Sequence, residues 1–299
     1  MAKINLPSPL LDKKSRRPRR AAYALPTLFT AGNLYLGFLS VLKSFEGSMA
    51  VKGGLVGPVP QFEVAAKAIG IAVVLDGLDG RIARMTGTES DFGREMDSLA
   101  DVITFGVAPA VLAYAFGIQF VDFSSDMLVR DNVIRAGVFM CFLFLLCSAS
   151  RLARFNVQTN PVPTNPGRPD RKYFVGLCTP ASAGLVAAIV NAADCVPIQW
   201  WPVAVAWLAL MGMLAFLMVS TWRYRSFKDL NMMAPRAPIT VVLLASLIYL
   251  IVNYNQPVLL GIAVAYVGSG IVVRIGGIVR RLLKRSQPPA QHPHQQTSL

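Results

Sequence analysis

Long apolar stretches alternate with short polar segments along most of the chain. A helix needs about 20 consecutive apolar residues to cross the hydrocarbon core of a bilayer, and this pattern predicts eight such helices. The predicted spans cover residues 24–44, 62–84, 92–117, 133–153, 174–193, 199–220, 238–253 and 257–278. The expected fold class is therefore all-α, a polytopic integral membrane protein with about eight transmembrane helices.

Composition and charge support this interpretation. Of the 299 residues, 54% are hydrophobic, and the formal net charge is +13. Basic residues gather before the first predicted span, around residues 223–228 and at 280–285, whereas the alternate loops carry few. By the positive-inside rule, both termini are cytoplasmic, in a bacterial-type inner or plasma membrane. We expect the basic excess to meet anionic membrane lipids, and we expect no nucleic-acid partner, because no polar folded domain remains to bind one.

The two ends of the chain differ from its middle. Residues 1–20 are basic and are predicted to form a cytoplasmic tail, and residues 286–299 are rich in Pro and Gln and are predicted to be disordered. Residues 21–285 form the predicted membrane domain. Both histidines, His292 and His294, lie in the C-terminal tail, so histidine catalysis within the membrane domain is excluded.

Four carboxylates stand at the facing ends of the second and third predicted spans. They are Asp76, Asp79, Asp97 and Asp101, within the segment DGLDGRIARMTGTESDFGREMDSLAD. At about 100° per residue, the two acids of each pair share one helix face, so two helices joined by a polar turn can aim all four into one pocket. Oxygen donors without His or Cys suit hard divalent cations, Mg²⁺ or Mn²⁺.

Small residues and a cation accompany these acids. Gly80 and Ala83 lie on the face of the first acidic pair, and Gly93 lies on the face of the second. They leave room for a ligand to approach the backbone, and Arg84 provides a fixed positive charge suited to phosphate oxygens.

Other interpretations of the acids remain open. They can be helix-end and loop residues paired with Arg81, Arg84 and Arg94, and intramembrane carboxylates also occur in divalent-cation transporters. Transporters place such acids near the middle of the membrane on broken helices. The acids here lie at one end of their spans, which favours a site for a phosphorylated substrate.

The spacing of these residues resembles a family signature. The pattern Asp76-x2-Asp79-Gly80-x2-Ala83-Arg84-x8-Gly93-x3-Asp97-x3-Asp101 is similar to that of the CDP-alcohol phosphotransferases at every position. Within the family, the segments at 76–81, 97–110, 151–156 and 173–177 resemble the phosphatidylserine synthase branch. The glycerol-phosphate-using branch typically has Lys after the last Asp, where this chain has Val102. The resemblance covers residues 20–280, and Cys178 departs from it where Pro is expected.

The resemblance implies a reaction and its components. The donor would be CDP-diacylglycerol, the acceptor L-serine and the leaving group CMP, with two divalent cations, Mg²⁺ or Mn²⁺, held by the four aspartates. Asp101 would also be the general base. Gly80, Ala83 and Gly93 would flank the cytidine, and Arg84 the pyrophosphate. The family further implies a homodimer. By the positive-inside rule, the site would face the cytoplasm.

The acceptor is the part that the residues leave open. The carboxylate of serine needs a cation, and Arg151 and Arg154 lie near the cytoplasmic end of the fourth predicted span. Either arginine can equally be a positive-inside anchor. Glycerol 3-phosphate, inositol phosphate and choline remain alternative acceptors.

Overall fold

A computed structural model describes residues 20–86, 91–122, 127–159, 173–220, 223–225 and 256–270. Side chains are described for residues 28–78, 92–122, 130–157, 176–220 and 256–270. The predicted span 238–253, the predicted N-terminal tail except Arg20, the whole predicted C-terminal tail and the end of the predicted span 257–278 lie outside these residues.

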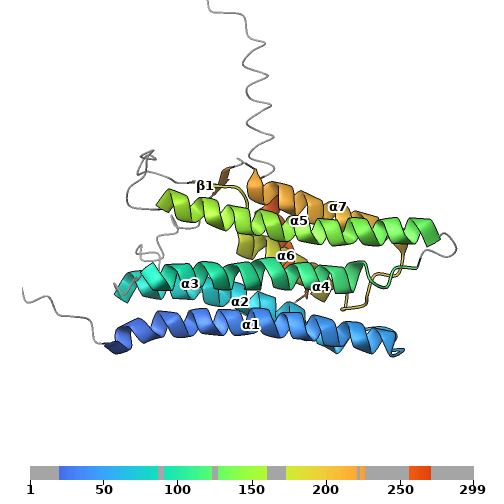
Figure 1. Ribbon diagram of the computed structural model, residues 1–299, viewed down its shortest axis with the longest axis horizontal. Helices are drawn as coiled ribbons and strands as arrows, with labels where there is room; N and C mark the ends of the chain where they lie inside the picture. Colours follow the sequence, from blue (N-terminus) through green and yellow to red (C-terminus); the bar gives the residue numbers. More distant parts are fainter. Residues whose placement is uncertain are drawn as a thin grey trace, which may run out of the picture.

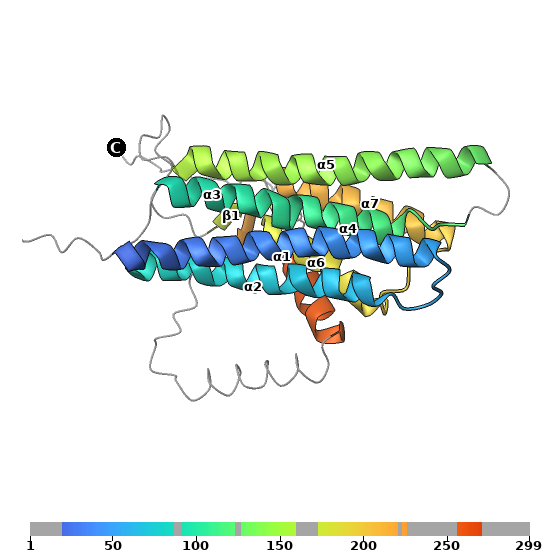
Figure 2. The ribbon, with the colours of Figure 1, turned by 60° about the horizontal axis from the view of Figure 1, so that its bottom comes forward.

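The described part of the chain is a bundle of long helices that run side by side along its longest axis (Figures 1 and 2). The helices in chain order are α1 (Arg20–Lys52), α2 (Pro60–Thr86), α3 (Asp91–Asp101), α4 (Ala108–Gly117), α5 (Met127–Thr159), α6 (Thr179–Ala192), α7 (Trp201–Val219) and the helix Gln256–Gly270. Proline lies in the first turn of α4, α6 and α7, where its missing N–H has no helical partner to lose.

Four helices among the described residues are long and apolar enough to cross a membrane, namely Leu28–Lys52, Phe92–Gly117, Arg130–Val157 and Trp201–Val219. Helix α2 coincides with the predicted span 62–84 but is not one of these four helices. Charged residues lie along its length. Helices α6 and Gln256–Gly270 are apolar but shorter. The all-α membrane fold is therefore confirmed for these residues, whereas the count of eight spans is not.

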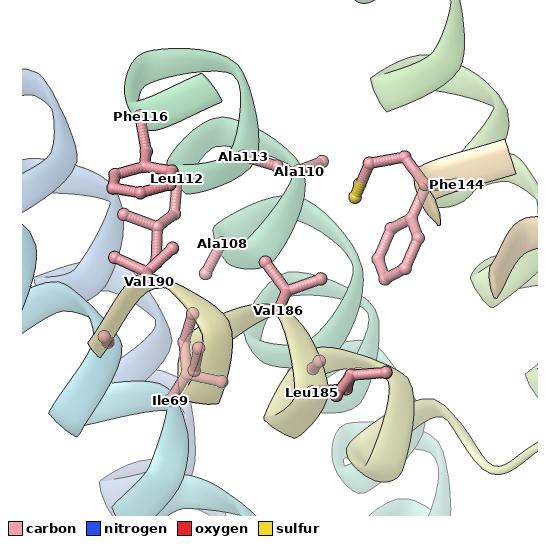
Figure 3. Packing of buried hydrophobic residues seen from close by; sticks show 14 of the residues in the cluster. Ile69, Ala108, Ala110, Leu112, Ala113, Phe116, Phe144, Leu185, Val186 and Val190 are labelled. Carbon is pink, nitrogen blue, oxygen red and sulfur yellow. The ribbon is translucent and has the colours of Figure 1, made fainter. Parts of the chain in front are cut away.

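Small and aliphatic side chains fill the centre of the bundle. Ile69 of α2, Leu112 of α4, Phe144 of α5 and Val186 of α6 are all buried and meet in one cluster (Figure 3). Alanines of α4 and α6 pack among them, and small residues let membrane helices approach closely. The core thus fixes α2, α4, α5 and α6 relative to one another.

The predicted span 92–117 is not a uniform α-helix. Helix α3 passes into a π-helical segment, η1 (Val102–Val107), before α4 begins. Gly106 lies in η1, and a Cβ at this position would stand 2.9 Å from Leu145 Cδ1 of α5. The missing side chain therefore lets α5 lie close to η1. Single π-turns are frequent at functional sites, and this one follows Asp101 directly.

The start of the predicted span 174–193 is wrong, because the structure has a strand there. Strand β1 (Tyr173–Val175) pairs antiparallel with β2 (Arg223–Arg225), with Phe174 opposite Tyr224. Gly176 follows with φ +82, and a Cβ there would lie 2.5 Å from the carbonyl oxygen of Met218. Because only glycine adopts this conformation readily, the apolar run breaks here. Cys178 is extended (φ −72, ψ 143), and α6 begins after it.

Candidate active site

The first acidic pair lies in the second half of α2. Asp76 is half-buried and its carboxylate points into a cavity between helices. The backbone of Asp79, Gly80, Ala83 and Arg84 belongs to the same helix, but their side chains lie outside the described residues. The predicted roles of these four residues stay predictions.

The second acidic pair lies on α3. Asp97 and Asp101 are four residues apart, which puts them on one face of this helix. Asp97 is half-buried and Asp101 is buried, with 8% of its surface exposed. Carboxylate oxygens of Asp76, Asp97 and Asp101 all lie within 4.8 Å of one another. The structure therefore brings together three of the four predicted ligands from two helices.

This arrangement fits a divalent cation. Three carboxylates held so close repel one another unless a positive charge lies between them. One carboxylate oxygen of Asp97, Oδ1, is buried and has no hydrogen-bond partner within the described part of the chain. A buried carboxylate oxygen without a partner is costly, and a metal ion would satisfy it. The donors are all hard oxygens, as Mg²⁺ and Mn²⁺ prefer.

The acids open into a cavity of about 600 Å³. This volume is typical of a small-molecule site. The lining residues are Val73, Asp76, Gly77, Arg94, Asp97, Ser98, Asp101, Arg151, Leu152, Phe155, Asn156, Cys178, Thr179, Pro180, Ala181 and Tyr266. They come from α2, α3, α5, the start of α6 and the helix Gln256–Gly270, so the cavity lies between elements that are distant in sequence.

The two candidate acceptor arginines lie in different surroundings. Arg151 of α5 lines the cavity and interacts electrostatically with Asp76 and Asp101. Its Nε is buried and has no hydrogen-bond partner among the described residues. Arg154 is exposed, is not part of the cavity lining, and donates from Nη1 to the carbonyl oxygen of Val219 at 3.2 Å. The geometry favours Arg151 as the cation that a substrate meets.

Gly93, the remaining predicted donor-site residue, is half-buried in the first turn of α3. It is not among the residues that line the cavity. It lies one turn before Asp97 on the same side of the helix. Its predicted contact with the cytidine stays a prediction.

Sequence reasoning missed several lining residues. Asn156 donates from Nδ2 to Ser98 Oγ at 2.8 Å, which joins α5 to α3 beside the acids. Thr179 and Tyr266 line the cavity from the start of α6 and from the last described helix. The sequence signal for Tyr266 is a tyrosine in a largely apolar predicted span, and nothing in the sequence indicates what it faces.

Comparison with known proteins places this site in a family. A sequence model described as CDP-alcohol phosphatidyltransferase matches residues 23–190, more than half of the chain and the part that contains all four aspartates. That match agrees with the resemblance drawn from the aspartate spacing.

Named relatives align over the same part. A Helicobacter pylori protein named CDP-diacylglycerol–serine O-phosphatidyltransferase is 36% identical over 214 residues, covering 72% of this chain and 77% of the relative. A Saccharomyces cerevisiae protein of the same name is 34% identical and covers 52% of each chain. An archaetidylserine synthase of Methanothermobacter thermautotrophicus is 34% identical, covering 56% of this chain and 65% of its own. The chain belongs to the CDP-alcohol phosphatidyltransferase family.

Proposed function

We propose that the protein transfers the phosphatidyl group of CDP-diacylglycerol to the hydroxyl of L-serine, giving phosphatidylserine and CMP. The observation that carries this proposal is the cavity itself, which three carboxylates line together with the half-buried side chain of Arg151. The names of the bacterial and yeast relatives support serine as the acceptor. Val102 also stands where the glycerol-phosphate-using branch has Lys.

The proposed metal site contains two divalent cations, Mg²⁺ or Mn²⁺. Asp76, Asp97 and Asp101 would hold them together with Asp79 of α2. When bound, these cations would neutralise the charge of the pyrophosphate and lower the pKa of an alcohol beside them. The close approach of the three described carboxylates supports this assignment.

The protein's own side chains perform the remaining tasks. Asp101 accepts the proton of the serine hydroxyl. The oxygen of this hydroxyl then forms a bond to the phosphorus that bears diacylglycerol. The bond from this phosphorus to the bridging oxygen of the pyrophosphate breaks, and CMP leaves with that oxygen. Arg151 binds the serine carboxylate and so orients the hydroxyl. In the proposed donor site, Gly80, Ala83 and Gly93 flank the cytidine and Arg84 binds the pyrophosphate.

We further propose that the cavity faces the cytoplasm and that the enzyme is a homodimer in an inner or plasma membrane rich in anionic lipid. The ends of α2 and α5, the start of α3 and strand β1 lie at the same end of the bundle (Figures 1 and 2). Arg81 and Arg84 near the end of α2, Arg94 near the start of α3 and Arg154 near the end of α5 belong to this end, which supports a cytoplasmic location.

The function is tested by CMP release from CDP-diacylglycerol with purified protein. Serine, glycerol 3-phosphate, inositol phosphate and choline are offered in parallel, with and without EDTA. Of the four acceptors, we expect only serine to support turnover. EDTA should abolish this turnover, and added Mg²⁺ or Mn²⁺ should restore it. Turnover with glycerol 3-phosphate and none with serine would overturn the acceptor, and full activity after exhaustive metal removal would overturn the metal site.

The orientation is tested by thiol labelling of Ser125→Cys and Ser226→Cys in a cysteine-free background. Both positions lie in predicted loops outside the described residues. We expect a membrane-impermeant reagent added from outside to label the first and not the second. Equal labelling of both from that side would contradict the proposed topology.

A further inference from the structure

The helix Gln256–Gly270 packs against the bundle although it lies beyond the part that the family model matches. Leu260, Ala263 and Val267 recur at spacings of three and four and contact the core, and Val267 is 4% exposed. At the start of this helix, Gln256 Nε2 donates to Asp194 Oδ1 at 2.9 Å. Figure 2 shows the helix beside α6. Its position is therefore fixed by side-chain contacts along its length.

Tyr266 brings this helix into the cavity. Its side chain is among the lining residues, and its hydroxyl lies 3.4 Å from Cys178 Sγ, directly before α6. Arg151 lines the same cavity and lies near Tyr266. A phenolic hydroxyl and a guanidinium therefore occupy the same side of the cavity.

Thr179 adds a second hydroxyl to that side. It is the first residue of α6, lines the cavity and is fully buried, with 0% of its surface exposed. Its Oγ1 has no hydrogen-bond partner among the described residues. Buried hydroxyls are nearly always hydrogen-bonded, so a group bound in the cavity would satisfy this one. The positive end of the α6 dipole further favours an anion here.

We propose that Tyr266 and Thr179 are specificity-determining residues that donate hydrogen bonds to the carboxylate of an amino-acid acceptor held by Arg151. This inference rests on the proposed function and extends it to residues outside the aspartate signature. A planar carboxylate has several acceptor sites, which one guanidinium does not fill. Two hydroxyl donors beside the guanidinium complete the hydrogen bonding of the carboxylate. They discriminate against acceptors that lack a carboxylate.

The test separates recognition of the acceptor from structural support. Tyr266→Phe and Thr179→Val each remove a hydroxyl and keep the shape of the side chain. We expect each to raise the KM for serine about tenfold, as loss of a hydrogen bond to a charged group implies, with the KM for CDP-diacylglycerol unchanged. Thr179→Ser keeps the hydroxyl and should retain the parent KM.

The matched control is Tyr35→Phe, because Tyr35 lies on α1 with 63% of its surface exposed. It should leave both KM values unchanged. An unchanged KM for serine in both Tyr266→Phe and Thr179→Val would overturn the inference, as would an equal rise in both KM values. If Tyr266→Phe does not fold, the pair Thr179→Val and Thr179→Ser decides.

Failure of the proposed function is a separate result. A parent protein that releases CMP with another acceptor and not with serine would refute serine as the substrate. The same variants are then assayed with that acceptor. If the variants keep the parent KM for that acceptor, Tyr266 and Thr179 do not bind the acceptor, whichever acceptor the enzyme uses.

Discussion

The two sides of the cavity are built in different ways. The acidic side consists of Asp76, Asp97 and Asp101, which come from two helices that follow each other in the chain. The opposite side consists of Arg151, Thr179 and Tyr266, which come from three elements spread over more than 100 residues. The acidic side belongs to the matched family region in full, whereas the opposite side extends beyond it.

This difference separates chemistry from selectivity. Every member of a family that cleaves the same pyrophosphate needs the same charge neutralisation, and a short local signature can encode it. The alcohol differs between members, so the residues that contact it can change and can come from any helix that borders the cavity. Variants on the acidic side should therefore abolish turnover, and variants on the opposite side should change the acceptor KM.

The largest effect is expected on the acidic side. Asp76→Asn and Asp97→Asn each keep the size of the side chain but remove a charge that a cation needs. CMP release should fall to background in both. Addition of Mn²⁺ should raise the thermal unfolding temperature of the parent protein and not that of the variants. Asp122→Asn, at an exposed position outside the cavity, is the control and should remain active.

The next effect concerns the two arginines. Arg151→Ala should raise the KM for serine roughly 10- to 150-fold, corresponding to a loss of about 1.5–3 kcal/mol for a charge-assisted hydrogen bond. The KM for CDP-diacylglycerol should change far less. Arg151→Lys should recover only part of the affinity, because an ammonium does not reproduce the planar fork of a guanidinium.

Arg154→Ala is the matched comparison for this prediction. Because Arg154 lies outside the cavity lining and is exposed, its replacement should leave the KM for serine near the parent value. A large rise for Arg154→Ala together with none for Arg151→Ala would reverse the assignment that the structure favours.

A smaller effect is expected from moving the two sides apart. In Gly106→Ala the added Cβ would stand 2.9 Å from Leu145 Cδ1 and 3.3 Å from Ser148 Oγ, both on α5. We expect α5, with Arg151, to shift slightly from η1, which lowers the free energy of unfolding by about 1–3 kcal/mol. The KM for serine should rise severalfold. Gly70→Ala is the control, because a Cβ there meets nothing within 4 Å.

The smallest effect concerns the hydrogen bond that joins α3 to α5 beside the cavity. Ser98→Ala removes the Oγ that accepts from Asn156 Nδ2 and donates to the Arg94 carbonyl oxygen at 3.0 Å. Thermal unfolding in detergent should show a loss of about 1 kcal/mol, with turnover nearly unchanged. Ser269→Ala removes an exposed hydroxyl whose hydrogen bond among the described residues lies within its own helix, and it should lose less. Loss of all activity in Ser98→Ala would mean that this residue contacts substrate.

The sequence by itself determined the membrane class, the family and the acidic side of the cavity. Apolar length predicts membrane helices because bilayer thickness fixes the length of a span. The i, i+3 and i+4 spacings of the aspartates predict shared helix faces because helix geometry is local. Both inferences depend only on residues near one another in the chain. The division into residues 1–20, 21–285 and 286–299 stays a prediction.

Only the tertiary structure decided what faces these aspartates. The choice of Arg151 over Arg154 depends on how α5 packs against η1, and the presence of Thr179 and Tyr266 depends on where two further elements dock. The strand at Tyr173–Val175 likewise forms because Arg223–Arg225 lies beside it. Contacts between residues distant in sequence are set by packing of the whole bundle, which no local pattern of apolar and polar residues records.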